Sequence, residues 1–124
     1  MKKIISTENA PKAIGPYSQA VEAGNFIFLS GQIPLKIDGT IVDGSIKDQT
    51  KQVLDNIEEI LKEVGLGFED VVKTTVYLSD MSDFGEMNEV YCKYFKDNYP
   101  ARVAIQASEL PKEVGVEIDA IAAK

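Results

Sequence analysis

The segment PARVAIQASELP, residues 100–111, places one guanidinium group in a run that alternates like a β-strand. Arg102 shares a strand face with Ala104 and Gln106, because side chains two residues apart point the same way. The small Ala104 side chain leaves open space beside the arginine. A guanidinium beside open space can bind a carboxylate through two parallel hydrogen bonds, so Arg102 is a candidate anion-binding residue. The alternative is a strand end whose arginine lies in water.

A second candidate is the carboxylate of Glu117, in the run VGVEIDAIAA (residues 114–123). Val116 and Ile118 share one face of this predicted strand, and Glu117 and Asp119 share the other. Burial among apolar residues raises the pKa of a carboxyl group, and a nearby arginine lowers it again. Such a carboxylate can hold and activate a water molecule. Alternatively, Arg102 and Glu117 form a structural salt bridge between adjacent strands.

Four further residues carry side-chain or backbone groups that can contribute to a binding site. Tyr17 lies on a loop braced by prolines, and Gly31, in Ser-Gly-Gln, leaves backbone groups open at a strand end. Asn88 lies in a predicted helix, where asparagine is a mediocre helix former. Each also has an ordinary interpretation: Tyr17 as a packing residue, Gly31 as a common strand end and Asn88 as a solvated helix position. Cys92 is expected to be a small, partly buried side chain.

Composition excludes several classes of chemistry. The 124 residues indicate one domain spanning 1–124, with 44% apolar residues to form its core. Because the chain has no histidine and one cysteine, Ser-His-Asp and Cys-His catalysis, most zinc sites and an intrachain disulfide are excluded. A net charge of −7 disfavours nucleic-acid binding. No apolar run has the length of a membrane span or a signal peptide, so the expected location is the cytoplasm.

The elements that must position these residues follow from periodicity and turn signals. Two helices are expected, at residues 45–67 and 81–100. The first has a cap at Ser45 or Asp48 and a stop at Gly65, and the second ends at Pro100. Loops are expected at 9–19 and 35–44. Five strands are expected, at 19–23, 26–30, 71–79, 101–107 and 114–123, the first two joined by a hairpin turn at Gly24-Asn25.

Two amphipathic helices can cover only one face of such a sheet. The strands at 26–30 and 114–123 are nevertheless apolar at nearly every position, which is typical of strands buried on both faces. A partner subunit is therefore expected to cover the second face, and we predict a homo-oligomer.

Together, NAPKAIGPYSQ, FLSGQIP, QTKQVLDNIEEILKEVGL, VVKTTVYLSDMSDFGEMNEVY and PARVAIQASELPKEVGVEIDAIA resemble the Rid family, specifically its RidA group. The resemblance covers about residues 4–122. It implies an α+β, chorismate mutase-like fold with a mixed six-stranded sheet, two helices on one face and a homotrimer with sites between subunits. It also implies hydrolysis of 2-imino acids from pyridoxal-phosphate enzymes, such as 2-iminobutanoate and 2-iminopropanoate, to 2-oxo acids and ammonia, without a cofactor.

The resemblance also assigns roles to individual residues. Arg102 corresponds to the carboxylate-binding arginine and Glu117 to the acid/base glutamate. The remaining predicted substrate-binding residues are Tyr17, Asn88 and, through backbone groups, Gly31, Val103 and Ala104. Many relatives carry a cysteine at the position of Ala104, so thiol chemistry or thiol-linked regulation at the site is not expected here.

Two other functions remain compatible with the residues. One is a non-catalytic trimer that binds small carboxylates as a regulator, or acts as a chaperone. Arg102 would then set affinity, and Glu117 would matter little. The other is an endoribonuclease or translation inhibitor, which the net charge of −7 disfavours because phosphate contacts need cations.

Overall fold

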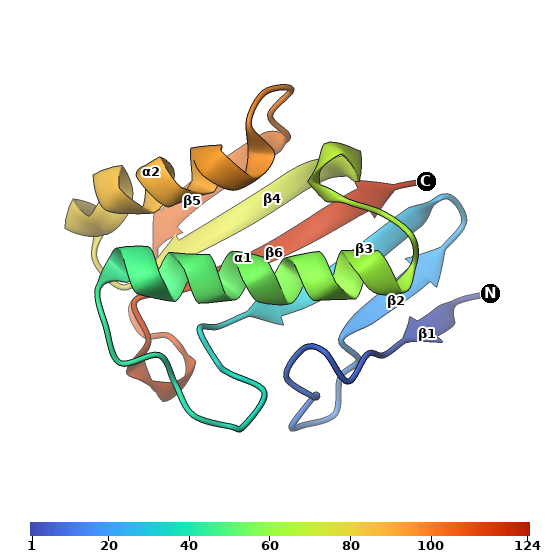
Figure 1. The fold of residues 1–124 in the computed structure, drawn as a ribbon, viewed down its shortest axis with the longest axis horizontal. Coiled ribbons are helices and arrows are strands. Elements are labelled where there is room, and N and C mark those ends of the chain that lie inside the picture. Colours follow the sequence, from blue (N-terminus) through green and yellow to red (C-terminus); the bar gives the residue numbers. More distant parts are fainter.

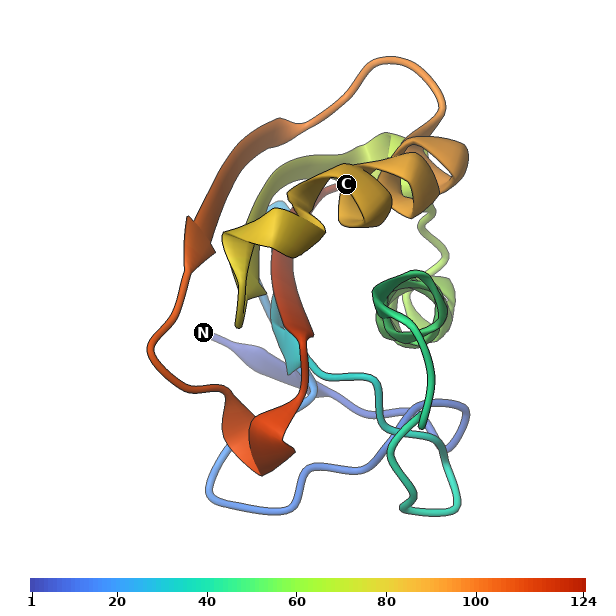
Figure 2. The ribbon, with the colours of Figure 1, turned by 90° about the vertical axis from the view of Figure 1, so that its left-hand side faces the viewer.

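The computed structural model describes all 124 residues, which form one six-stranded mixed sheet with both long helices on the same side (Figures 1 and 2). The strand order is β1-β2-β3-β6-β4-β5, and β4 with β5 is the parallel pair. The strands are β1 (Lys3–Ile5), β2 (Ala20–Ala23), β3 (Phe26–Gln32), β4 (Val71–Leu78), β5 (Ala101–Gln106) and β6 (Val116–Ala123). The helices are α1 (Ile46–Glu63) and α2 (Phe84–Phe95). This confirms the predicted fold class.

Strand β1 is the element that periodicity missed. Its three residues, Lys3 to Ile5, pair antiparallel with β2, and only Ile5 is buried. So short an edge strand offers too few residues to show alternation. The predicted hairpin between β2 and β3 is confirmed, because Ala23 pairs with Phe26 and Gly24 adopts a positive φ of 59°. The predicted loop at 35–44 is also confirmed, although Leu35 within it is buried.

Helix α1 forms as predicted and is capped by Ser45. The Ser45 Oγ accepts a hydrogen bond from the Asp48 backbone N–H at 3.2 Å, satisfying a donor that the first turn leaves free. At the other end Gly65 takes the left-handed conformation (φ 74°), and its N–H donates to the Lys62 carbonyl at 3.0 Å.

Helix α2 ends five residues before Pro100, where the sequence analysis placed its end. The Lys96 N–H still donates to the Cys92 carbonyl at 2.9 Å, but Lys96 itself has a φ of 63° and Asn98 follows with 52°. These two left-handed residues turn the chain toward β5 before the proline can act. A short 3₁₀ turn, Met81–Asp83, precedes the helix.

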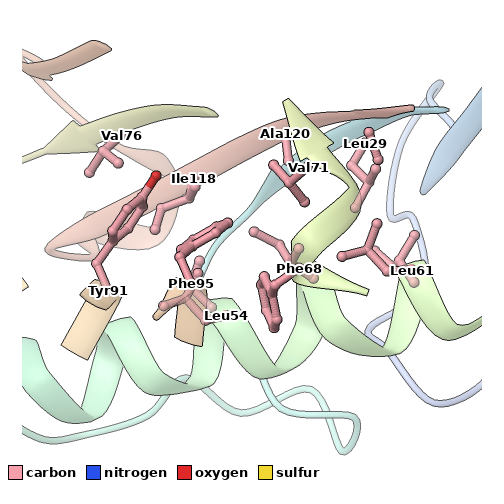
Figure 3. Close-up of a cluster of buried hydrophobic side chains, with 14 of the residues drawn as sticks. Leu29, Leu54, Leu61, Phe68, Val71, Val76, Tyr91, Phe95, Ile118 and Ala120 are labelled. Carbon is pink, nitrogen blue, oxygen red and sulfur yellow. The ribbon is translucent and has the colours of Figure 1, made fainter. Parts of the chain in front are cut away.

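The core lies between the helices and the sheet (Figure 3). Leu54 and Leu61 of α1, Tyr91 and Phe95 of α2, and Ile118 of β6 are all buried there. Each strand alternates, so its other side chains point to the opposite face of the sheet, which no helix covers (Figure 2).

This open face of the sheet carries exposed apolar side chains. Phe26 and Phe28 of β3 are 45% and 44% exposed, and Val103 and Ile105 of β5 are 43% and 45% exposed. Glu117 and Asp119 lie on the same face, because Tyr77 pairs with both Glu117 and Ile105 in the sheet register. Neither helix is both long and apolar enough to pass through a membrane.

Candidate active site

Arg102 does not extend into water from the start of β5. Its Nη1 donates a hydrogen bond to the Asn88 Oδ1 at 2.7 Å. The guanidinium carbon lies 4.8 Å from the ring centroid of Tyr91 and 5.4 Å from that of Phe84. All three partners come from α2, on the helix side of the sheet. The interpretation of Arg102 as a solvated strand end, and of Asn88 as a solvated helix position, is therefore wrong.

Arg102 and Asn88 line a pocket of about 350 Å³, which we call the arginine pocket. Its other lining residues are Tyr91, Cys92, Tyr99 and Pro100. Cys92 is exposed rather than partly buried, because it lies on the outer face of α2. The Cys92 thiol lines the arginine pocket, whereas the position of Ala104 carries none, and the expectation that no thiol chemistry takes place at the site stays a prediction.

The two predicted backbone donors that follow Arg102, the N–H groups of Val103 and Ala104, point in opposite directions. The Ala107 N–H donates to the Leu78 carbonyl of β4 at 2.8 Å. Because backbone groups alternate in direction along a strand, the N–H of Val103 also points toward β4, whereas that of Ala104 points away from it. Strand β5 is an edge strand, so the amide of Ala104 is directed to the free edge of the sheet.

Glu117 lies on β6 beside a β-bulge in β3. Leu29 pairs with Ala120 and Gln32 pairs with Ile118, so two residues, Ser30 and Gly31, face a single residue of β6. The bulge brings the backbone of Gly31 against the Glu117 side chain. A Cβ added at Gly31 would collide with the Glu117 carboxylate. Glycine permits this close approach, and its backbone conformation is one that other residues can also adopt.

A second pocket, of about 400 Å³, contains Tyr17, Gly31 and Glu117, and we call it the glutamate pocket. The remaining lining residues are Ile14, Ser30, Ile33, Pro111 and Lys112. Tyr17 is 50% exposed, so it does not pack in the core of this chain.

A buried amide holds the loop that carries Tyr17. The Gln19 Oε1 accepts a hydrogen bond from the Thr7 N–H at 2.7 Å, and its Nε2 donates to the Pro11 carbonyl at 2.8 Å. The Ser30 hydroxyl donates to the Ser18 carbonyl at 2.5 Å. These bonds tie the loop both to the start of β2 and to the bulge of β3.

Burial is the main influence on the Glu117 carboxyl group. It raises the pKa of Glu117 above the ordinary value, and the neighbouring Asp119 carboxylate raises it further. Tyr77, which pairs with Glu117, also has a raised pKa, first through burial and then through Asp119 and Glu117. A carboxyl group of this kind can take and return a proton nearer neutral pH than an exposed one. No group of three or more potential ligand side chains could hold a metal ion.

Arg102 and Glu117 do not meet within one chain. Strand β4 lies between β5 and β6, and the pairing of Thr74 with Arg102 places the arginine on the helix face. Glu117 points to the open face. The alternative of a salt bridge between adjacent strands is therefore wrong, and the two side chains lie in separate pockets on opposite sides of the sheet.

Sequence reasoning did not assign Tyr91, Tyr99 or Lys112 to a site. Tyr91 follows the apolar spacing of its helix and so has the pattern of a core residue, although it lies one helical turn from Asn88. Tyr99 and Lys112 carry no sequence signal, because their places in the pockets depend on turns with left-handed residues, including Lys112 itself with a φ of 56°.

Comparison with known proteins gives consistent matches. The model of the family described as Endoribonuclease L-PSP matches residues 7–124. A RutC family protein of Pyrococcus horikoshii is 61% identical, covering 100% of this chain and 99% of its own. The mouse 2-iminobutanoate/2-iminopropanoate deaminase is 51% identical, over 98% of this chain and 91% of its own. The solved structure of Escherichia coli TdcF with bound serine is 43% identical, covers 98% of both chains and superposes with a TM-score of 0.94. The chain belongs to the Rid family, also described as Endoribonuclease L-PSP.

Proposed function

We propose that this protein hydrolyses short-chain 2-imino acids to 2-oxo acids and ammonia. The main support is that the predicted side chains gather into two pockets, one with an arginine and one with a half-buried carboxylate. The similarity to the mouse deaminase, over nearly the whole chain, supports the same reaction. The serine bound to E. coli TdcF supports recognition of a small molecule with a carboxylate next to a nitrogen-bearing carbon.

In this proposal Arg102 binds the substrate carboxylate. Asn88 occupies one side of the guanidinium, which leaves further N–H groups for two parallel bonds to the substrate. The Ala104 amide, directed to the free edge of β5, is a second candidate donor. These contacts fix the imine carbon, and orientation of this kind removes much of the entropic barrier.

Glu117 is proposed to activate the attacking water. It takes a proton from the water as the oxygen adds to the iminium carbon, forming a tetrahedral 2-amino-2-hydroxy acid. It then returns that proton to the nitrogen and accepts the hydroxyl proton as the C–N bond breaks, which releases the 2-oxo acid and ammonia; the last proton leaves with ammonia as ammonium. A positioned general base contributes about 10²–10⁴-fold. Tyr17 and the backbone of Gly31 line the wall around this carboxylate.

A complete site then needs two copies of the chain. The arginine pocket and the glutamate pocket lie on opposite faces of one sheet and cannot act on the same substrate within one chain. Each complete site therefore combines the arginine pocket of one copy with the glutamate pocket of a neighbouring copy. The exposed Phe26, Phe28, Val103 and Ile105 give the open face the apolar character of a surface covered in an oligomer. The resemblance to the Rid family favours a homotrimer.

The test couples an amino-acid dehydratase to this protein in the presence of semicarbazide, which traps free imine. Wild type is expected to accelerate 2-oxo acid formation and to suppress semicarbazone, and Arg102→Ala and Glu117→Gln are expected to lose both effects. The matched controls are Lys62→Ala and Glu59→Gln, which remove one exposed and one partly exposed charge on α1, away from both pockets.

Two outcomes contradict the proposal. If wild type leaves semicarbazone formation unchanged but binds 2-oxobutanoate through Arg102, the protein is a carboxylate-binding module. If Glu117→Gln turns over as fast as wild type, Glu117 is not the base.

A further inference from the structure

Arg102 extends from an edge strand, where a long side chain would ordinarily sample many rotamers. Three side chains of α2 restrict it: Phe84, Asn88 and Tyr91, which we call the Arg102 cluster. Positions 84, 88 and 91 recur at helical spacing and therefore lie on one face of the helix. The two rings contact the guanidinium, and Asn88 accepts its Nη1 hydrogen.

Tyr91 is itself fixed by two contacts and by burial. Its hydroxyl is 2.7 Å from the Thr74 hydroxyl, and Thr74 is the residue of β4 that pairs with Arg102. Its ring stacks on Phe95 with centroids 4.4 Å apart, and the side chain is only 4% exposed. Figure 3 shows the Tyr91 hydroxyl directed from the helix toward the sheet. The ring is thus a rigid surface between β4 and α2, against which the guanidinium rests.

This arrangement has a chemical consequence for ligand recognition. A planar guanidinium stacks on aromatic faces, whereas an ammonium group offers no plane to stack. Contact with the two rings fixes the guanidinium, and the bond to Asn88 fixes its rotation. The N–H groups not used by Asn88 are then oriented before a ligand arrives, which lowers the entropic cost of binding.

We infer that Phe84 and Tyr91 are positioning residues that orient Arg102 for two-bond recognition of a carboxylate, and so set the KM of the reaction. The inference rests on the proposed function in assigning the carboxylate to Arg102. Its geometric part is independent of turnover, because it concerns the arginine in the ligand-free protein.

Arg102 is the only arginine in the chain, which gives a direct probe. The ¹H–¹⁵N spectrum must contain one arginine Nε–Hε resonance. In wild type we expect this proton to be shifted upfield by the two rings and protected from exchange with water. Phe84→Leu and Tyr91→Leu should each move it toward the value of a free arginine, whereas Tyr91→Phe, which keeps the ring, should not.

Kinetics then separate positioning from general stability. Phe84→Leu is expected to raise KM on the order of tenfold and to leave kcat within about twofold, because the glutamate pocket is untouched. Phe84 is only partly buried, so this variant tests the inference even if Tyr91→Leu does not fold. Leu66→Ala serves as the stability control, since Leu66 packs against the same core from outside both pockets and should leave KM and the arginine resonance unchanged.

An arginine resonance at the free-arginine position in wild type, or a wild-type KM in Phe84→Leu, would overturn the inference. Failure of the proposed function looks different. In that case the arginine resonance is still shifted and protected, but neither wild type nor any variant hydrolyses imine.

Discussion

Replacing Gly31 with alanine tests whether the position of the Glu117 carboxylate governs catalysis. The new Cβ would lie 3.0 Å from the Glu117 Cδ and 3.2 Å from its Cγ, and it would overlap the carboxylate oxygen. Carbon atoms in contact prefer about 3.5–4.0 Å, so the carboxylate must move by roughly 1 Å. A displacement of that size in a catalytic group costs about 10²-fold in rate, or roughly 2.7 kcal/mol of transition-state stabilisation.

Stability should respond far less than activity. The atoms that must move are the end of a flexible side chain, and Gly31 lies outside the left-handed region, so alanine adopts its backbone conformation without strain. We therefore expect a melting temperature close to that of wild type together with the loss in kcat, both measured on the same preparation. Gly85→Ala is the matched control. A Cβ there meets nothing within 4 Å, and the helix should gain about 1 kcal/mol with kcat unchanged. A folded Gly31→Ala protein with wild-type kcat would refute the role given to Glu117.

Three other changes have defined outcomes. Arg102→Lys should lower kcat/KM by about 10²-fold in steady-state assays, because lysine keeps the charge but neither stacks nor binds a carboxylate through two parallel bonds; equal activity would contradict two-bond recognition. Burial first, and the Asp119 carboxylate second, raise the pKa of Glu117, so the acidic limb of the pH profile of kcat/KM should lie above the ordinary pKa of a glutamate. Asp119→Asn should move this limb to lower pH, and a limb that does not move would exclude coupling between the two carboxyl groups. Alkylation of Cys92 with iodoacetamide should inhibit the enzyme by filling the arginine pocket, whereas Cys92→Ser should be active and insensitive to the reagent.

Local features of the fold were predictable because local forces determine them. The Ser45 cap, the left-handed Gly65 and the Gly24 turn each depend on a few neighbouring residues, and all three were confirmed. The alternation of Val116 and Glu117 along β6 was also correct, since it follows from strand geometry alone. The end of α2 was not predictable in the same way, because Lys96 adopts a conformation that its residue type disfavours.

The residues of the candidate site could be named from the sequence, but their separation into two pockets on opposite faces of the sheet could not. Which strand lies between β5 and β6 depends on contacts between residues far apart in the sequence, and no local pattern encodes them. The relative orientation of Arg102 and Glu117 follows from that strand order and from the pairing register, where a slip of one residue would exchange the faces. The aromatic surroundings of Arg102 were hidden for a related reason, because Tyr91 at helical spacing looks like any other core residue.

The central claim is that Arg102 of one copy works with Glu117 of another. It is tested by co-expressing Arg102→Ala and Glu117→Gln chains in equal amounts and measuring imine hydrolysis by the purified mixed oligomers. Each variant alone should be inactive. If every site takes its arginine and its glutamate from different copies, random assembly restores about one quarter of the sites, and activity should return to about that fraction of wild type. Mixed oligomers no more active than the separate variants would contradict a site shared between copies.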